Sequence, residues 1–550
     1  MTPTRRDLFA AAAGLGVGTA TFHRALAAQA PDFPATVTPE MVRNAEWVAG
    51  LELTDDQRRL VAQGLTNAMR GSAALHRAKV GNDVPPALHF LPDPGRPPGG
   101  PRGTVAFVPP ATDRPGNDDD LAFLPLTKLA ALLREKKVSS TDLTKLALAR
   151  LKKYDPALKC VVNLTEELAL RQAAEADREL AAGTPRGPLH GVPWVAKDLI
   201  AYPGTKTTWG AAPFREQTID VKATVADRID RAGGVMVAKV TLGALAMGDR
   251  WFGGMTRNPW NVRQGSSGSS AGSASAVAAG CAGYGIGSET WGSITSPSTR
   301  CGVTGLRPTF GRVSRHGCMA LSWSMDKLGP LARSVEDCAL ILSVIHGHDG
   351  HDPTAQTHPF SWPAARPLKE MRVGFFEDST TDAVKKVLTD LGVRLVPFRL
   401  PTGLPLGALS VILDVEASAA FDDLTRAGVT EGLNSWPATF RRARFIPAVD
   451  YLRAQRVRTL VMRQMAAAMT DVDVYVGSPD NGLLTNLTGH PVVCLPNGLA
   501  RADGVEVPTS LTFTGRLWGE TELLAVAKAY QDATGHHLRR PDMTKVTVQE

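Results

Sequence analysis

The 550-residue sequence lacks several features that would indicate particular classes of protein. Its cysteines include no CxxC pair, which argues against a zinc ribbon or a redox motif. No run of five or more basic residues occurs and aromatic residues make up 6%, so nucleic-acid binding is not expected despite a formal net charge of +7. No run of eighteen apolar residues occurs, so we expect no membrane-spanning helix. We expect mostly buried free thiols at the six cysteines, Cys160, Cys281, Cys301, Cys318, Cys338 and Cys494.

The first thirty residues have the pattern of a targeting segment. Arg5 and Arg6 precede a weakly apolar run rich in Ala and Gly, and small residues follow over 25–30, where a signal peptidase can cleave. This pattern resembles a bacterial twin-arginine export signal. We therefore predict a signal peptide over 1–30 and a periplasmic or secreted protein. The apolar run is too short and too rich in Gly to span a membrane, so no stable membrane insertion is expected after its removal.

The rest of the chain divides into two parts by composition. Residues 31–120 are predicted to form an N-terminal helical extension, with helix starts at Thr38 and Thr54 and a Pro- and Gly-rich arm. Over 121–545, helical and strand patterns alternate, which indicates an α/β fold with a mixed or parallel sheet. Within this part, residues 345–460 are mostly helical and carry few motifs.

A serine-rich segment, GSSGSSAGSASA, runs from Gly265 to Ala276. A flexible linker would continue into polar sequence, but an Ala-rich, helix-competent stretch and a short strand candidate follow. Residues 268–272 also fit the G-x-S-x-G elbow of α/β hydrolases, yet no apolar strand precedes them. Ser324 and Lys327 fit S-x-x-K, but no K-T-G follows. Gly and Ser between regular elements instead let backbone N–H groups approach a ligand or an anion.

Seven long segments occur in an order and at spacings typical of one enzyme family. They are GVPWVAKD, TRNPWN, GSSAGSASAVAAG, GSETWGSITSPSTRCGVTGLRPTFGRVSR, SMDKLGPLARSVEDCALIL, TNLTGHPVVCLPNG and FTGRLWGETELL. Together they resemble the amidase signature family over about residues 121–541. The resemblance implies the amidase signature fold, a large mixed β-sheet core flanked by helices. It also implies an amidase, a hydrolase acting on linear carbon–nitrogen amide bonds, with no metal and no organic cofactor.

The resemblance also implies a Ser–Ser–Lys triad. Lys197 is the lysine of the G-V-P-x-x-x-K-D motif, and Ser269 is the bridging serine, which in this family usually adjoins a cis peptide bond. Ser293 is the nucleophile. The apolar sequence around Lys197 is expected to lower the pKa of its amine. Neutral Lys197 would then take a proton from Ser269, which takes one from Ser293, and a covalent acyl-enzyme forms on Ser293. Asp198 is interpreted as structural, bonding to nearby backbone.

The nucleophile loop is expected to supply an oxyanion hole, and here the chain departs from the family pattern. The family's D-T-G-G-S is E-T-W-G-S, with Glu289 and Trp291, and an arginine that often follows is replaced by Thr295. Trp291 keeps its N–H in the hole if its φ is negative, whereas a positive φ would strain it. Trp291 and Met247 are the candidate substrate-binding residues. The oxyanion donors are expected to be backbone N–H groups, those of Thr290, Trp291, Gly292 and Ser293.

These observations lead to one main function and several alternatives. The main hypothesis is an exported amide hydrolase that acts on a small-molecule amide. One alternative is the glutamine-amide subunit of a tRNA amidotransferase, which shares this fold; the predicted export signal argues against it because charged tRNA is cytoplasmic. Hydrolysis of an ester or a carbamate is another, and a catalytically inactive binding protein is the non-enzyme alternative. The sequence indicates no nucleic-acid partner, no particular substrate and no oligomeric state.

Overall fold

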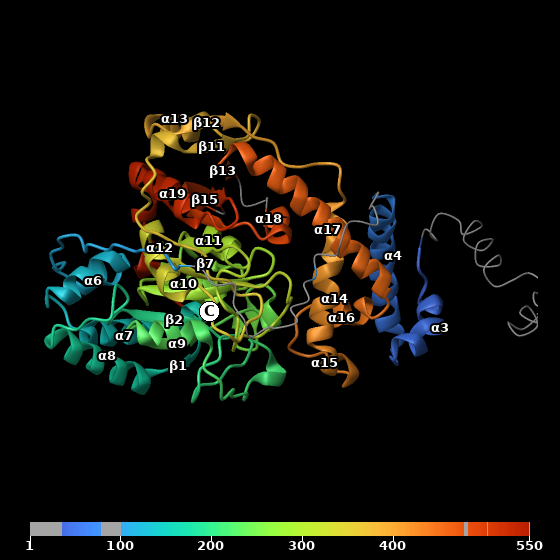
Figure 1. Cartoon of the computed structure of the whole chain (residues 1–550). Helices are drawn as coiled ribbons and strands as arrows, with labels where there is room; N and C mark the ends of the chain where they lie inside the picture. The colour runs from blue at the N-terminus through green and yellow to red at the C-terminus, as the bar shows by residue number, and fades with distance from the viewer. Residues whose placement is uncertain (1–35, 79–87, 89–100, 478–481, 503, 549–550) are drawn as a thin grey trace, which may run out of the picture.

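The computed structural model describes the chain except for residues 1–35, 79–87, 89–100, 478–481, 503 and 549–550 (Figure 1). The predicted signal peptide, residues 1–30, and part of the Pro- and Gly-rich arm therefore lie outside the described residues.

Helices occur along the whole described chain. They are α3 (Pro39–Ala49), α4 (Asp55–Arg77), α5 (Asp118–Ala122), α6 (Leu126–Arg134), α7 (Ser140–Leu158), α8 (Glu166–Ala181), α9 (Thr224–Arg231), α10 (Ala271–Ala278), α11 (Thr295–Cys301), α12 (Val335–Ile345), α13 (Asp382–Asp390), α14 (Ser410–Ala420), α15 (Asp422–Arg426), α16 (Trp436–Ala443), α17 (Ala448–Ala468), α18 (Gly482–Thr488) and α19 (Glu520–Thr534). A short 3₁₀ turn, η4 (Leu406–Leu409), leads into α14.

An eleven-stranded mixed sheet forms the centre of the molecule, which confirms the predicted fold class. In spatial order its strands are β1 (Val161–Leu164), β3 (Val235–Val240), β2 (Pro193–Lys197), β8 (Tyr284–Glu289), β10 (Lys327–Ala332), β9 (Thr304–Arg307), β14 (Val492–Ala502), β15 (Val505–Gly515), β13 (Val474–Gly477), β11 (Arg372–Phe375) and β12 (Arg394–Pro397). Strand β2 runs parallel to both neighbours, whereas β8 and β10 are antiparallel. Two small sheets pair β4 (Arg250–Trp251) with β5 (Gly254–Met255) and β6 (Arg257–Asn258) with β7 (Asn261–Gly265).

Strand β2 is buried on both faces because helices cover each side of the sheet. Its side chains alternate between two apolar clusters, with Trp194 and Ala196 in one and Val195 in the other. Helices α9, α12 and α19 contribute to the first cluster, and α7, α8 and α10 to the second. The alternation directs Lys197 to the same face as Val195, the face covered by α10. The fold thus places the start of α10 next to the end of β2.

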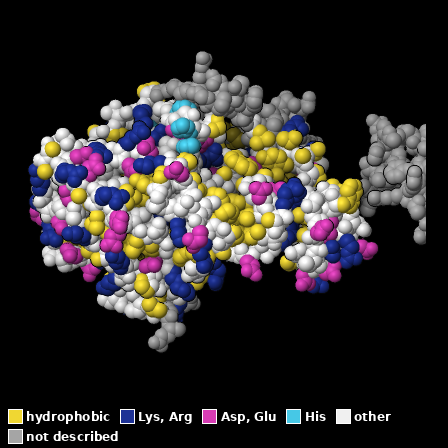
Figure 2. Space-filling view, turned by 90° about the horizontal axis from the view of Figure 1, so that it is seen from below, with side chains coloured by type: hydrophobic (Ala, Val, Ile, Leu, Met, Phe, Trp, Pro, Cys, Tyr) yellow, Lys and Arg dark blue, Asp and Glu magenta, His cyan; other side chains and the backbone are white. Residues whose placement is uncertain are grey.

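The first two described helices of the extension, α3 and α4, begin where the sequence predicts. The side chains of Thr38 and Thr54 accept hydrogen bonds from backbone N–H groups in the first turn of each helix. Figure 1 shows both helices at one end of the molecule, beside α14 and α16, and α4 contacts α16, α17 and η4. In Figure 2, charged side chains of both signs are interspersed over the left half of the face, and hydrophobic side chains gather right of centre.

The cysteines behave as expected from the sequence. All six are free thiols, and each is buried except Cys318, which is half-buried. Across the described ranges, each helix is either too short or too polar to cross a membrane.

Candidate active site

Lys197 ends the central strand β2, and its side chain is fully buried. Its Nζ donates hydrogen bonds to the Oγ atoms of Ser269 at 2.8 Å, Ser288 at 2.9 Å and Ser270 at 3.1 Å. The backbone oxygen of Ser288 lies at 3.3 Å. These contacts include no carboxylate. The amine is therefore surrounded by hydroxyl groups, which accept hydrogen bonds from a charged amine and exchange protons with a neutral one.

Burial changes the protonation of this amine. It lowers the pKa of Lys197 to about 7, because the charged form loses its hydration inside the protein. The charges of Asp326 and Glu289 raise the pKa but do not reverse the shift. Roughly half of the molecules then carry a neutral amine near pH 7, which is the range that suits a general base.

The segment before α10 brings Ser269 to this amine. The peptide bond between Gly268 and Ser269 is cis, as the resemblance implies. A Cβ atom on Gly268 would come within 1.9 Å of a backbone oxygen, so only glycine fits there. The next residue, Ser270, ties the segment to its surroundings. Its backbone N–H donates to the carbonyl oxygen of Ser293 at 3.0 Å, and its Oγ accepts from the N–H of Ser288 at 3.1 Å.

Ser293 lies in the loop between β8 and α11 and is half-buried, in contrast to the fully buried Ser269. The two hydroxyl groups form no hydrogen bond with each other among the described contacts; the two segments are joined through the backbone of Ser270. Catalytic hydrogen bonds are often long before a substrate binds. The structure thus brings Lys197 and Ser269 into contact and places Ser293 in the adjoining loop.

The loop that carries Ser293 has unused backbone donors. In the described chain, the N–H groups of Trp291, Gly292 and Ser293 donate to no protein acceptor. The positive φ of the loop falls on Gly292, at 95°, and Trp291 is not among the residues with positive φ. Trp291 therefore meets the requirement for a negative φ, under which a tryptophan keeps its N–H in the loop without strain. Unpaired N–H groups beside a serine hydroxyl are the arrangement needed to hold a developing oxyanion.

A buried carboxylate holds this loop in place. Oε2 of Glu289 accepts hydrogen bonds from the backbone N–H groups of Ile294 at 2.8 Å and Thr295 at 3.0 Å. Its other oxygen, Oε1, accepts from Nη1 of Arg307 at 2.6 Å and from Nδ2 of Asn486 at 2.8 Å. Both carboxylate oxygens thus accept hydrogen bonds, one from the loop and one from side chains on β9 and α18.

The charge of Glu289 is stabilised by this environment. Burial alone would raise its pKa, but the charges of Arg307 and Lys327 and the hydrogen bonds from the loop outweigh burial and hold the pKa at about 2. Sequence reasoning noted Glu289 only as a departure from the family pattern, and it missed the roles of Arg307 and Asn486. Arg307 and Asn486 lie 18 and 197 residues away from Glu289 along the chain, so no local sequence pattern links them to it.

A cavity of about 350 Å³ adjoins the loop, with Ser288 and Thr290 in its wall. Much of the remaining wall is apolar and includes Leu199, Ala246, Met319, Leu321 and Leu328. Neither candidate substrate-binding residue lines this cavity. Met247 accepts a hydrogen bond on its sulfur from Ser435 at 2.8 Å, and Trp291 packs against an apolar cluster to which α14, α17 and α18 contribute.

Asp198, next to Lys197 in sequence, turns away from the amine. Its Oδ2 accepts a hydrogen bond from the backbone N–H of Thr208 at 2.8 Å, and its Oδ1 lies 2.9 Å from Nζ of Lys239. This agrees with the structural role predicted for Asp198. Within the described ranges, no group of three or more His, Cys, Asp or Glu residues is arranged to hold a metal ion.

The chain is similar to known proteins in sequence and in fold. The family model named Amidase matches residues 142–481. A glutamyl-tRNA(Gln) amidotransferase subunit from Heliobacterium modesticaldum is 33% identical, over 76% of this chain and 98% of that protein. The corresponding protein from a Marinomonas species is 34% identical, over 76% and 99%. Among solved structures, the peptide amidase from Stenotrophomonas maltophilia is similar with a TM-score of 0.65 and 29% identity, over 76% of this chain and 98% of that one.

Proposed function

The chain belongs to the amidase family, whose members act on carbon–nitrogen amide bonds, and from that premise we propose that it cleaves an amide through an acyl-enzyme on Ser293. The observation that carries the proposal is the 2.8 Å contact between Nζ of Lys197 and Oγ of Ser269, made by an amine whose pKa is about 7. A neutral lysine in contact with a hydroxyl is a base that can activate a serine.

The reaction follows from the positions of these groups. Neutral Lys197 takes the proton of Ser269, which takes the proton of Ser293, and Oγ of Ser293 attacks the amide carbonyl carbon. The free N–H groups of the loop bind the oxyanion. The relay then runs backward: the proton passes to the leaving nitrogen, the carbon–nitrogen bond breaks, and an amine departs. Water attacks the ester on Ser293 by the same relay and releases the acid.

Two uses of this chemistry remain as candidates. In the first, water is the final acceptor and the protein is a free-standing amide hydrolase, for which the likeness to a peptide amidase is the support. In the second, the amide is that of glutamine and the released ammonia passes to a partner protein. The curated relatives support this second use better, because each is one subunit of an amidotransferase and is matched over nearly its full length. Ester or carbamate hydrolysis stays a further proposal, as does the export predicted from residues 1–30.

A substrate panel separates these uses. The purified full chain is assayed for ammonia release from glutamine, a C-terminal peptide amide, a primary aryl amide and a primary aliphatic amide, and for alcohol release from one carbamate and one ester. Turnover of peptide or aryl amides without any partner supports the hydrolase. Turnover of glutamine alone, at a rate that rises when partner subunits are added, supports the amidotransferase role. Failure to hydrolyse any of these compounds, together with failure of a fluorophosphonate to label Ser293, would overturn the proposed chemistry.

A further inference from the structure

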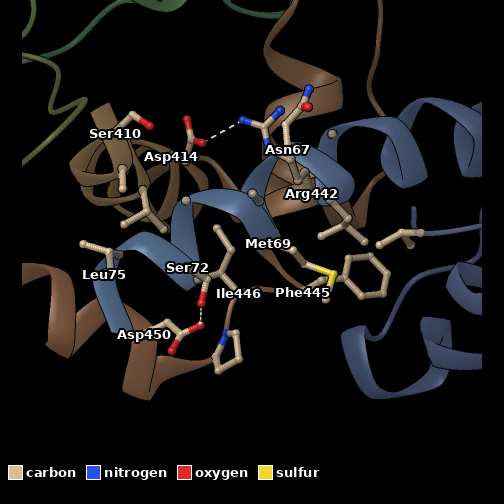
Figure 3. Close-up of a pocket in the computed structure, with 18 of the residues that line it drawn as sticks. Asn67, Met69, Ser72, Leu75, Ser410, Asp414, Arg442, Phe445, Ile446 and Asp450 are labelled. Carbon is tan, nitrogen blue, oxygen red and sulfur yellow. Dashed lines mark hydrogen bonds and ion pairs between the residues drawn. The ribbon is translucent and has the colours of Figure 1, made fainter. Parts of the chain in front are cut away.

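A cavity of about 680 Å³ lies between the helical extension and the helical part of the main domain, away from the residues proposed for catalysis. One side is formed by α3 and α4, and the other by η4, α14, α16 and the start of α17 (Figure 3). Neither Lys197 nor Ser269 nor Ser293 belongs to its wall. The extension precedes the residues that the family model matches, 142–481, so half of this wall is built by sequence outside the family match.

The wall is mostly apolar. Figure 3 shows Leu75, Met69, Phe445 and Ile446 around the space. The other apolar side chains of the wall are those of Val37, Met41, Val42, Ala45, Leu65, Ala68, Ala408, Val411 and Pro447. Pockets that bind small molecules typically have this character, a volume of roughly 300–1,000 Å³ lined by apolar side chains with a few polar groups.

Small residues keep the space open. A Cβ atom on Gly407 would meet nothing within 4 Å, so the volume beside this residue is unfilled. A Cβ atom on Gly71 would lie 3.6 Å from the Cβ of Ala408, which is an ordinary contact. Gly64 has a different role, because a Cβ atom there would come within 2.7 Å of the Arg442 side chain that packs across it. The extension therefore docks closely at Gly64 and leaves the cavity beyond it.

The charged groups of the wall are already engaged. Nη2 of Arg442 lies 2.7 Å from Oδ2 of Asp414, and Oγ of Ser72 donates to Oδ2 of Asp450 at 2.7 Å (Figure 3). Arg442 is the only cation of the wall within the described chain, and it is paired. An anionic ligand would therefore meet two carboxylates and no unpaired positive charge, which disfavours it.

We propose that this cavity binds an uncharged, mainly apolar small molecule, such as one with an alkyl or aryl group. A polypeptide segment fits less well, because extended backbone placed in this space would find few free polar groups to pair with its N–H and C=O groups. The cavity also communicates with the proposed active site through packing. Leu75 lines it and belongs to the apolar cluster against which Trp291 packs, and Val411 lines it and packs against the same cluster.

The proposal is tested by titrating the full chain with N-phenylnaphthylamine, an uncharged dye whose fluorescence rises in apolar surroundings. Saturable binding of one dye per chain is expected. The anionic analogue anilinonaphthalene sulfonate should bind about tenfold more weakly. Gly407→Leu fills the cavity and should weaken dye binding about tenfold or more. Gly116→Leu is the matched control, because Gly116 also has open space around it but lies outside the wall, and it should bind as the wild type does.

Several outcomes would overturn the proposal. Equal affinity of Gly407→Leu and wild type for the uncharged dye would place the binding elsewhere, and absence of saturable binding would refute a ligand site. Wild-type protein that dimerises on size exclusion, while Gly407→Leu does not, would assign the face to a second copy of the chain. If Gly407→Leu fails to fold by circular dichroism, Val411→Phe fills the same space from α14 and carries the same expectation.

Discussion

Oε1 of Glu289 lies 2.6 Å from Nη1 of Arg307, and both side chains are fully buried behind the loop that carries Ser293. Replacing Glu289 by Gln removes the charge and leaves the guanidinium of Arg307 buried without its partner. Breaking a buried ion pair in this way costs about 3 kcal/mol. We expect Glu289→Gln to lower the free energy of unfolding by that amount in urea denaturation, and to lower kcat because the loop loses its anchor.

A surface pair is the control for this prediction. Lys386 and Asp390 form an exposed ion pair on α13 at 2.8 Å, and Lys386→Gln should change the unfolding free energy by less than about 0.5 kcal/mol.

The pKa of Glu289 also predicts how the free energy of unfolding changes in acid. The pKa of Glu289 is lowered from 4.5 to about 2, so its contribution is complete above pH 4.5 and is lost as pH falls towards 2. Glu289→Gln should lack this loss, and an unchanged acid slope in the variant would contradict the assignment.

The ring of Trp291 is expected to stabilise the loop that carries Ser293. It is half-buried against the apolar cluster of α14, α17 and α18. We expect Trp291→Ala to cost about 2 kcal/mol in unfolding free energy, less than for a fully buried tryptophan, and to lower kcat. Trp291→Phe keeps most of the contact, so it should retain most of the unfolding free energy and most of kcat. Trp47 is 79% exposed, and Trp47→Ala should have little effect on either measurement.

Local sequence predicted the framework of the site. The strand pattern around Lys197, the strand before Glu289 and the helix after Ser269 all correspond to observed elements, β2, β8 and α10. Because these elements are adjacent in the sheet and its helical layer, correct local assignment together with the family motifs was sufficient to group the three proposed catalytic residues.

What could not be predicted depends on long-range packing. The direction of the Trp291 ring was undecided from the sequence, since it depends on helices that follow more than a hundred residues later. The apolar cavity was not predicted either. It forms where α4 meets residues of α14 and α16, and no motif links those segments.

The twin arginines give a prediction that separates the two candidate uses of the enzyme. Arg5 and Arg6 are expected to direct export, so replacing both by Lys, which keeps their charge, should hold the precursor in the cytoplasm. Arg24→Lys, a change of the same kind in the same segment, should leave export intact. Cell fractionation with immunoblotting measures both. If the wild type and both variants all stay cytoplasmic, the export hypothesis is wrong and the amidotransferase role becomes the stronger candidate.

The proposed relay predicts graded losses of turnover. Ser293→Ala should abolish hydrolysis because the acyl group has no attachment point, and Lys197→Ala should nearly do so because no base remains. Ser269→Ala should be severe but leave a trace. Ser275, in the same serine-rich segment, donates to the backbone oxygen of Arg257 at 2.8 Å, and Ser275→Ala should keep most of the rate. Fluorophosphonate labelling with mass spectrometry checks the nucleophile independently, and a Ser293→Ala enzyme that retains most of the wild-type rate refutes it.

The protonation of Lys197 predicts the pH dependence of kcat/KM. The amine acts as a base only when neutral, and burial lowers its pKa to about 7, so kcat/KM should rise with pH and level off above about 8. Below pH 7, each unit should cost about a factor of ten. His316, in the wall of the cavity beside the loop, supplies the control, since His316→Asn should leave this acid limb in place. If the limb disappears in His316→Asn, a histidine is the titrating group and the neutral lysine is not the base.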